Sequence, residues 1–245
     1  MTLKGRVALI TGAARRVGRA IAMALAEKGA RIAVHYNRSR AEGQTLAREL
    51  KDSFGVDCLA FGAELGKTAQ VRALAAAVAR RFGNIDILIN NASIYERTPL
   101  ATATEKEWDR HLDVNLKAPF FLSQAVAPIM KKSGGGKIIN IADWAGLRPY
   151  SDYTPYCISK AGLLCLNTAL AKGLAPSIQV NAVMPGPVLL PEGTPAKTRK
   201  AIEKATLVKR LGSPQDVAQA VLFLLERGDF MTGAAIPVDG GRLIA

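Results

Sequence analysis

The stretch Val7-Ala-Leu-Ile-Thr-Gly-Ala-Ala-Arg-Arg-Val-Gly-Arg-Ala20 decides the fold of this chain. Its apolar beginning predicts a buried strand over Val7–Thr11, and apolar residues at three- and four-residue steps predict a helix over Arg16–Lys28. Gly12 and Gly18 flank the turn between them. The start of such a helix can bind a phosphate group, because its free backbone N–H groups and the helix dipole favour an anion. A tight turn without a ligand remains the alternative on this segment alone.

The same alternation continues outward along the whole chain. Short β-branched runs alternate with longer segments of helical period, which is typical of βαβ units with a parallel sheet. We therefore predict an α/β fold: a single doubly wound Rossmann-type domain over residues 1–245, with a seven-stranded parallel sheet flanked by helices. The predicted strands are Val7–Thr11, Ala30–His35, Val56–Phe61, Ile85–Asn90, Lys137–Ala142, Ile178–Val183 and Ala235–Val238. The predicted helices are Arg16–Lys28, Arg40–Ser53, Thr68–Phe82, Glu105–Lys131, Pro155–Leu174 and Pro214–Glu226.

One stretch interrupts the alternation. Residues 185–196 contain four prolines and two glycines, and a short charged helix is predicted after them, over Lys197–Lys204. An irregular segment of this length in a compact domain is more often functional than decorative. We predict that residues 185–208 form a substrate-binding loop or lid.

The composition excludes several classes of protein. The 245 residues are 49% hydrophobic and 22% charged, unlike a disordered chain. No apolar run approaches the roughly 18 residues that begin to suggest a membrane span. The N-terminus enters a strand at once, without the pattern of a cleavable leader. We expect a cytoplasmic protein with no membrane partner.

The charge and the cysteines carry no specific signal. A net charge of +13 is compatible with binding to nucleic acid, to an acidic membrane surface or to an anionic small ligand. Lys and Arg are spread along the chain without a basic tail, so we expect a solvated basic surface and no nucleic-acid partner. Cys58, Cys157 and Cys165 match no metal or disulfide spacing, and we expect free thiols and no metal.

The end of the second predicted strand indicates which nicotinamide cofactor is used. Folds that prefer NAD place an acid about 20 residues beyond the glycine turn, where it bonds the ribose hydroxyls. Here Asn37, Arg38 and Ser39 follow the strand, and no acid occurs between Glu27 and Glu42. Arg38 can bind a 2′-phosphate bidentately. This favours NADP(H) over NAD(H), the alternative being an Arg38 that only starts a solvated helix. His35 is expected to be packed rather than catalytic.

A possible proton donor lies on the helix that follows the fifth strand. Tyr156 and Lys160 are four residues apart and therefore share one helix face. A free tyrosine titrates near pH 10, and a nearby ammonium favours the phenolate, which would bring the pKa toward neutral pH. The pair can thus serve as a general acid in a reduction.

These motifs together resemble the short-chain dehydrogenase/reductase family, from about Gly5 to Gly241. Its glycine turn reads TGxxxGxG, and here Arg16 replaces the middle glycine. Pteridine reductases of that family carry a basic pair similar to Arg15 and Arg16. The resemblance implies that Lys160 orients the nicotinamide ribose and begins a proton relay through Asn115. It implies these cofactor-binding positions: Gly12, Arg15, Arg16, Val17, Gly18, Asn37, Arg38, Ser39, Glu64, Leu65, Asn91, Ala92, Ser93, Tyr156, Lys160, Pro185 and Gly186.

Asp143 is the main departure from the family pattern. Most members place a serine thirteen residues before the tyrosine, whereas this chain has Asp143 there. A carboxylate would oppose the alkoxide charge that develops on a ketone, but an acid can help Tyr156 to protonate the nitrogen of a C=N bond. Pteridine reductases show the same replacement. An aspartate at a strand end that only meets water is the alternative.

Residues after the fourth strand also match that subgroup. Asn90-Asn91-Ala92-Ser93 resembles the NNAS of pteridine reductases, and Tyr95 matches an aromatic residue that stacks on the pterin ring. A half-exposed loop aromatic is the alternative for Tyr95. The catalytic residues implied are Asp143, Tyr156, Lys160 and Asn115, and the substrate-binding residues are Ser93, Tyr95, Asp143, Tyr153, Tyr156 and Pro187.

The resulting prediction is an NADPH-dependent reductase of pterins or folates. The alternative is a carbonyl reductase of the same family, including a 3-oxoacyl carrier-protein reductase. A cofactor-sensing module without catalysis is a third class, which the retained Asn115, Tyr156 and Lys160 disfavour. The resemblance and the apolar run Leu163–Leu166 further imply a homotetramer built on residues 105–131 and 155–174. Trp108 is expected to serve in packing.

Overall fold

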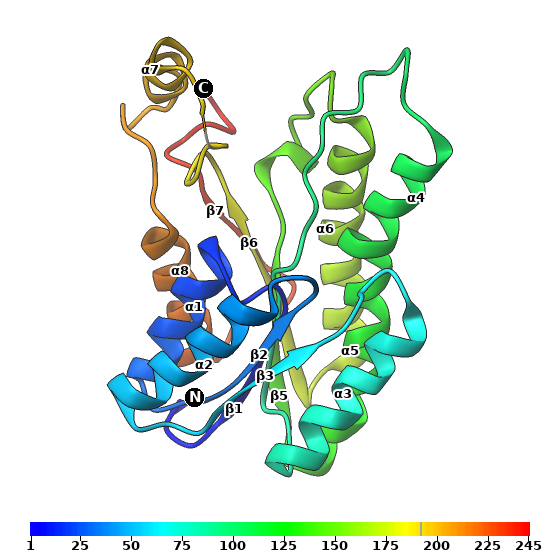
Figure 1. Ribbon diagram of the computed structural model, residues 1–245, viewed down its shortest axis with the longest axis vertical. Coiled ribbons are helices and arrows are strands. Elements are labelled where there is room, and N and C mark those ends of the chain that lie inside the picture. Colours follow the sequence, from blue (N-terminus) through cyan, green and yellow to red (C-terminus); the bar gives the residue numbers. More distant parts are fainter. Residues whose placement is uncertain (192) are drawn as a thin grey trace.

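The structure is a computed structural model that describes residues 1–191 and 193–245. A seven-stranded sheet with the order β3-β2-β1-β4-β5-β6-β7 forms its centre, and helices cover both faces (Figure 1). Every neighbouring pair of strands is parallel. The strands are β1 (Val7–Ile10), β2 (Arg31–Tyr36), β3 (Cys58–Gly62), β4 (Ile87–Asn90), β5 (Gly136–Ile141), β6 (Ile178–Pro185) and β7 (Ala235–Val238). The α-helices are α1 (Arg16–Glu27), α2 (Arg40–Phe54), α3 (Thr68–Phe82), α4 (Glu105–Leu112), α5 (Ala118–Lys132), α6 (Thr154–Leu174), α7 (Ala196–Ala205) and α8 (Pro214–Glu226).

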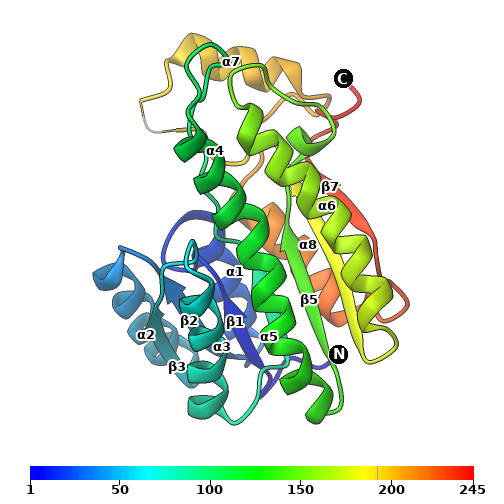
Figure 2. The ribbon, with the colours of Figure 1, turned by 90° about the vertical axis from the view of Figure 1, so that its right-hand side faces the viewer.

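The alternation of side chains along β1 explains the two layers of helices. All four residues of β1 are buried, and Ala8 and Ile10 pack in one core while Val7 and Leu9 pack in the other. Helices α1, α2 and α8 cover the first core, and α3, α5 and α6 cover the second, as Figure 2 shows from the side. A strand buried on both faces has no polar side, which explains its continuous apolar sequence. The predicted doubly wound sheet is confirmed.

The predicted helix over residues 105–131 is wrong in its interior. Helix α4 ends at Leu112, a π-helical turn spans Asp113–Lys117, and α5 then begins. Pro119 lies in the first turn of α5 and has no N–H to donate to the carbonyl of Asn115, four residues earlier. The widened turn accommodates this missing hydrogen bond. It also turns the Asn115 side chain into the protein interior, where it is 1% exposed.

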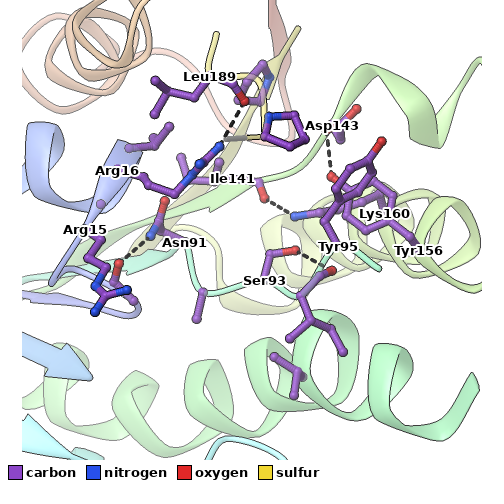
Figure 3. Close-up of a pocket in the computed structure, with 18 of the residues that line it drawn as sticks. Arg15, Arg16, Asn91, Ser93, Tyr95, Ile141, Asp143, Tyr156, Lys160 and Leu189 are labelled. Atoms are coloured by element: carbon purple, nitrogen blue, oxygen red, sulfur yellow. Dashed lines mark hydrogen bonds between the residues drawn. The ribbon is translucent and has the colours of Figure 1, made fainter. Parts of the chain in front are cut away.

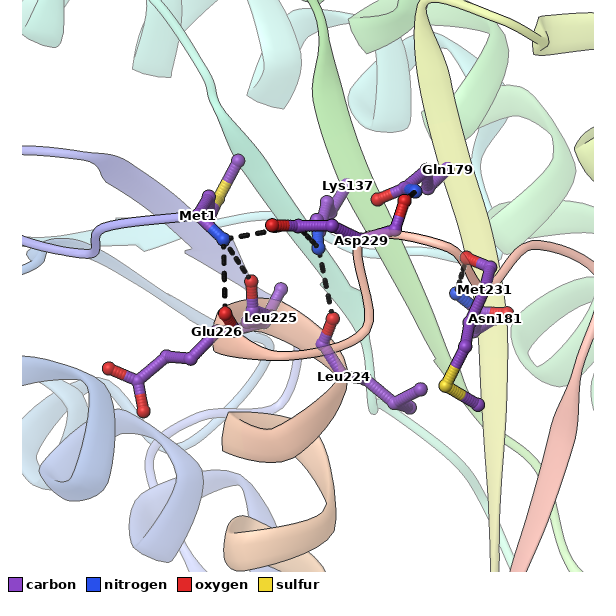
Figure 4. Close-up of polar contacts among 9 residues, drawn as sticks. All are labelled: Met1, Lys137, Gln179, Asn181, Leu224, Leu225, Glu226, Asp229 and Met231. Atoms are coloured by element: carbon purple, nitrogen blue, oxygen red, sulfur yellow. Dashed lines mark hydrogen bonds and ion pairs between the residues drawn. The ribbon is translucent and has the colours of Figure 1, made fainter.

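A polar cluster closes the end of the sheet away from the carboxyl ends of the strands (Figure 4). Lys137 is buried, and its Nζ donates to the Leu224 carbonyl at 3.1 Å and to Oδ1 of Asp229 at 2.6 Å. The amine of Met1 donates to the Leu225 carbonyl at 2.9 Å. Two cations thus meet the last carbonyls of α8, where the helix dipole is negative. This arrangement fixes α8 against the sheet.

In the part of the chain that the structure describes, no helix is long and apolar enough to cross a membrane. The three cysteines are free thiols, and Cys157 is buried beside Tyr156.

Candidate active site

A cleft of about 1660 Å³ lies at the carboxyl ends of the strands. Typical small-molecule pockets measure about 300–1,000 Å³, so this cleft has room for a dinucleotide and a second ligand. Parallel α/β sheets bind ligands at this edge, where the strand order reverses between β1 and β4. All the site residues that the sequence predicted line the cleft, with the exception of Asn115.

The turn after β1 is locked to the end of β4. Nδ2 of Asn91 donates to the carbonyls of Thr11 and Gly12 at 2.9 and 3.2 Å. The hydroxyl of Thr11 in turn accepts hydrogen bonds from the backbone N–H groups of Asn91 and Ala92. A Cβ at Gly18 would lie 2.3 Å from the Gly12 carbonyl oxygen, so glycine is required there for close packing. The turn is therefore rigid before any ligand arrives.

Arg16, at the position of the family's middle glycine, has a backbone conformation that favours glycine. Its φ is +54°, in the left-handed region that favours glycine. Its guanidinium reaches across the cleft, and Nη2 donates to the Leu189 carbonyl at 2.9 Å, as Figure 3 shows. Leu189 belongs to the predicted lid. Arg16 thus joins the phosphate-binding turn to the lid, a contact that its position in the sequence did not indicate.

His35 supports the turn from the end of β2. Its Nδ1 accepts a hydrogen bond from the Gly12 N–H at 3.1 Å, and its Nε2 donates to the Ala63 carbonyl at 3.0 Å. Burial lowers the pKa of His35 to about 4, against the weaker opposing effect of the bond to Ala63. The ring is therefore neutral at physiological pH. His35 is a packed structural residue, as the sequence predicted.

The groups beyond β2 are open to the cleft. Asn37 and Arg38 are exposed, and Arg38 makes no ion pair within the described residues 1–191 and 193–245. Arg15, by contrast, is paired with Glu42 of α2. Of the basic residues predicted here, Arg38 is thus the one with a guanidinium available to an anion.

Tyr156, Asp143 and Lys160 meet at the inner end of the cleft (Figure 3). The Tyr156 hydroxyl donates to Oδ2 of Asp143 at 2.7 Å, and Oδ1 of Asp143 accepts from the Ala145 N–H at 2.7 Å. Lys160 donates from Nζ to the Ile141 carbonyl at 2.8 Å and lies 5.7 Å from the centre of the Tyr156 ring. Asp143 is thus bonded to the phenol rather than directed to solvent.

The electrostatics of this group differ from the prediction. Burial raises the pKa of Tyr156 well above its usual value, and the neighbouring Asp143 raises it further. Burial also raises the pKa of Asp143, and burial lowers the pKa of Lys160 to about 8. The expected lowering of the Tyr156 pKa by Lys160 is therefore wrong for this structure. The ammonium is turned to the Ile141 carbonyl, while the carboxyl of Asp143 contacts the phenol directly.

Asn115 is placed behind the site rather than in it. Its Oδ1 accepts from the Ile94 N–H at 2.9 Å, and its Nδ2 donates to the Ile94 carbonyl and to the Ser159 hydroxyl, both at 3.0 Å. These contacts fix the loop that carries Ser93 and Tyr95 against α6. The proton relay through Asn115 stays a prediction.

Aromatic side chains form one wall of the cleft. Tyr95 is 47% exposed, stacks on Tyr153 with 4.4 Å between ring centres, and meets the ring of Tyr156 edge-on at 4.8 Å. Tyr150 and Trp144 extend the wall, and their rings lie 5.2 Å apart. The sequence analysis missed these last two residues and Arg242, all of which line the cleft. The only signal for Trp144 was its position next to Asp143.

Part of the predicted lid lines the cleft. Residues 186–191 and 193–195, between β6 and α7, form no helix or strand, and Pro187, Leu189, Leu190 and Pro191 line the cleft. Residue 192 of this predicted segment lies outside the described residues.

The comparisons with known proteins agree on the family. The family model described as "Enoyl-(Acyl carrier protein) reductase" matches residues 12–242. A protein named 3-oxoacyl-[acyl-carrier-protein] reductase FabG, from Thermotoga maritima, is 35% identical over 249 residues and covers 100% of both chains. A short-chain type dehydrogenase/reductase from Picea abies is 34% identical over 253 residues, covering 98% of this chain and 93% of its own. A blue fluorescent protein from a metagenomic library, solved in complex with NADPH, is similar with a TM-score of 0.90 at 32% identity, over 99% of each chain.

The fold and the site thus define a Rossmann-type oxidoreductase with a tyrosine and a lysine at its reactive end. The chain belongs to the short-chain dehydrogenase/reductase family.

Proposed function

We propose that this protein is an NADPH-dependent reductase of a C=N bond in a flat bicyclic heterocycle of the pteridine class. The observation that carries the proposal is the 2.7 Å hydrogen bond between Tyr156 and Asp143, which places a carboxyl group in the proton-donating pair.

The cofactor is NADP(H), and the residues present fit it. The side chain of Arg15, at the N-cap of α1, makes no capping hydrogen bond within the described chain, so the first N–H groups of the helix can bind a diphosphate. Arg38 can bind the 2′-phosphate, and no acid occurs near it in the sequence, between Glu27 and Glu42, to repel that group.

Replacing Arg38 by Asp is expected to reverse the preference for NADPH over NADH in a binding titration. Equal affinity of the parent protein for both cofactors would contradict the assignment.

In the proposed reaction, the protein's side chains supply the proton that the substrate nitrogen takes up. When bound, the cofactor supplies a hydride to a ring carbon. Tyr156 gives its proton to the adjacent ring nitrogen, so that C=N becomes CH–NH, and Asp143 returns a proton to the phenolate. Because burial raises the pKa of Asp143, this carboxyl holds a proton at a higher pH than a free aspartic acid does. Lys160, whose Nζ donates to the Ile141 carbonyl here, would hold the nicotinamide ribose beside Tyr156.

The shape of the cleft supports a flat substrate. The ring of Tyr95 stacks on Tyr153 with one face and meets the Tyr156 ring edge-on, and 47% of the side chain is still exposed at the cleft. A bicyclic ring gains about 1 kcal/mol beyond area burial from an offset stack on such a surface. We propose that the segment predicted as a lid covers a substrate bound here, since Pro187 and further described residues of that segment line the cleft.

A second candidate is the reduction of a 3-oxoacyl thioester carried by a carrier protein. The name of the relative from Thermotoga maritima favours this candidate over a pteridine. Asp143 speaks against it, because it stands where most members of the family carry a serine hydroxyl, and in its ionised form it opposes the negative charge that develops on a ketone oxygen. The name belongs to a relative, whereas Asp143 is a residue of this chain. We therefore rank the reduction of a pteridine above the reduction of a thioester.

One assay separates the two candidates. NADPH oxidation is followed with dihydrobiopterin, dihydrofolate and an acetoacetyl thioester at equal concentrations. We expect turnover of at least one dihydropterin and little turnover of the thioester. Turnover of the thioester alone would establish the second candidate and overturn the first.

The exposed apolar surface supports a homotetramer. Phe120 on α5 is 39% exposed, and with Leu112, Leu116 and Leu166 it forms the apolar part of a groove between α4, α5 and α6 that Asp109, Asp113 and Lys117 also line. These helices lie within the two segments predicted for subunit contacts. An apolar groove of this kind is typical of surfaces that another protein covers.

A further inference from the structure

Arg242 is held at the substrate end of the cleft by a fixed backbone. It follows β7, and the carboxylate of Asp239 accepts hydrogen bonds from the N–H groups of Gly241 and Leu243, the residues on either side, at 2.9 and 2.7 Å. Nη1 of Arg148 donates to the Arg242 carbonyl at 3.1 Å. These hydrogen bonds fix the backbone of Arg242. Its side chain lines the same cleft as Asp143 and Tyr156.

The guanidinium of Arg242 packs over the Trp144 ring, but no acid in the described chain forms an ion pair with it. Its Cζ lies 5.2 Å from the centre of the Trp144 ring, a distance typical of a cation–π contact. Within residues 1–191 and 193–245, no acid pairs with it and no acceptor takes its side-chain hydrogens. An arginine has five such hydrogens in a planar fork that suits a carboxylate or a phosphate. Among the other cations of the cleft, Arg15 is paired with Glu42, Arg16 donates to the Leu189 carbonyl and Lys160 donates to the Ile141 carbonyl. Arg38, after β2, and Lys106, on α4, also line the cleft without an ion pair in the described chain, and Arg38 is the one assigned to the cofactor.

An aromatic wall connects this guanidinium with the proton donor. From Tyr156 it passes through Tyr95, Tyr153 and Tyr150 to Trp144, with ring centres 4.8, 4.4, 6.0 and 5.2 Å apart. The positive charge of Arg242 is close enough to oppose the burial that raises the pKa of Tyr150. A substrate with a flat head at Tyr156 and a tail along the wall would therefore bring its tail to Arg242.

We infer that Arg242 and Trp144 form a subsite for an anionic group on the substrate tail, either a carboxylate or a phosphate. The inference rests on the proposed function for the identity of the head. If the head is a pteridine, the anion is a carboxylate such as that of the glutamyl tail of a folate. If it is a 3-oxoacyl thioester, the anion is the phosphate of a phosphopantetheine arm. The specificity-determining residue is Arg242 in both cases.

The test compares substrates that differ in the anion. The first pair is dihydrofolate, with carboxylates on its tail, and dihydrobiopterin, with an uncharged tail. The second is acetoacetyl-coenzyme A, which carries phosphates, and the acetoacetyl thioester of N-acetylcysteamine, which carries none. KM and kcat are measured with saturating NADPH for the parent protein, Arg242→Gln and Arg242→Lys. The control is Arg227→Gln, which removes an equal charge at an exposed position after α8, at the opposite end of the sheet.

The subsite predicts a change in KM for the charged member alone. In Arg242→Gln, the KM of the anionic substrate should rise about tenfold, the loss expected for one charge-assisted hydrogen bond, with kcat retained. The uncharged partner should keep its KM within about twofold, and Arg242→Lys should fall between, because it keeps the charge and loses the fork. An equal change for both members of a pair, or no change for either, overturns the subsite. The proposed function is tested separately by the identity of the pair that the parent protein reduces. Reduction of the pteridine pair supports it, and reduction of the thioester pair alone contradicts it.

A binding measurement covers the case in which neither pair is reduced. p-Aminobenzoylglutamate carries the anionic tail without a reducible ring, and its binding to the NADP⁺-loaded protein can be followed by isothermal titration calorimetry. We expect weaker binding to Arg242→Gln than to Arg227→Gln. Equal binding to these two variants would again overturn the subsite.

Discussion

At the scale of single residues, Asp143 determines what the reactive end of the cleft can do. Both of its oxygens are used, one by the Tyr156 hydroxyl and the other by the Ala145 N–H. It is also the N-cap of the short 3₁₀ turn that begins at Trp144, so its position is set by the backbone as well as by Tyr156. A group fixed in this way can exchange a proton with the phenol without moving.

Replacing Asp143 by Asn should keep the hydrogen-bonding shape and remove the ionisable acid. We expect the rate of pterin reduction to fall about a hundredfold or more, the usual loss when general-acid catalysis is removed. The affinity for NADPH should change little, because Asp143 lies at the substrate end of the cleft. Steady-state kinetics and a cofactor titration on the same preparation measure the two effects.

Asp143→Ser is the matched comparison for that variant. It supplies the hydroxyl that most members of the family carry, and we expect it to gain activity on simple activated ketones. Reduction of pterins by Asp143→Asn at the parental rate would remove Asp143 from the mechanism, and with it the chemical reason to prefer a pteridine.

At the scale of elements, β2 and α1 hold the phosphate-binding turn from two sides. The neutral ring of His35, at the end of β2, accepts the Gly12 N–H and donates to the Ala63 carbonyl. A protonated ring could not accept from Gly12. The packing of the turn therefore depends on the protonation state of one buried histidine.

This dependence predicts how stability varies with pH. The pKa of His35 is lowered from 6.5 in the unfolded chain to about 4 in the folded protein. Between these values the unfolded chain binds the extra proton, so the stabilisation is complete above pH 6.5 and is lost as the pH falls toward 4. The contribution amounts to about 3 kcal/mol. Urea unfolding at a series of pH values should show a smaller loss over this range in His35→Asn than in the parent protein, and equal losses would contradict the assignment.

Arg16 begins α1 in a conformation that costs an L-residue about 1–2 kcal/mol and costs glycine nothing. Arg16→Ala and Arg16→Gly both lose the hydrogen bond to the Leu189 carbonyl, but only the alanine keeps the strained Cβ. We expect Arg16→Gly to be more stable than Arg16→Ala by about 1 kcal/mol, after allowance for the greater freedom of glycine in the unfolded chain. Chemical denaturation without cofactor measures the difference. An alanine variant as stable as the glycine variant would show that the turn relaxes.

At the scale of the whole molecule, helices α4, α5 and α6 expose several large apolar side chains to solvent. Trp108 was expected to pack, but it is 39% exposed, as is Phe120. The prediction for Trp108 is wrong for the isolated chain, because no neighbouring element of the described chain covers this side of α4. Ile158 on α6 is exposed to a similar degree.

We predict that this surface is buried between subunits of a homotetramer. Light scattering at micromolar concentration should give four times the mass of one chain. Phe120→Glu should yield smaller species, because it places a charge in the apolar groove. A parent protein that scatters as a monomer would overturn the assembly, and a tetrameric Phe120→Glu would move the contact elsewhere.

The sequence by itself determined the features that repeat over a few residues. The period of apolar residues predicted the strands and helices to within a few residues, except for the π-helical turn that divides residues 105–131. The glycine turn and the Tyr156–Lys160 spacing placed both ends of the cleft. These features are local, because a period of two or 3.6 residues and a helix spacing of four follow from backbone geometry alone.

Only the tertiary structure decided the environment of each side chain. Trp144 follows β5 and Arg242 follows β7, so the two residues are far apart in the sequence. They are in contact only because the sheet brings the carboxyl ends of these strands to the same edge. The raised pKa of Tyr156 follows from its burial against Asp143, which the spacing of Tyr156 and Lys160 did not indicate. Desolvation and contacts between distant segments depend on how the whole chain packs, and no short stretch of sequence contains that information.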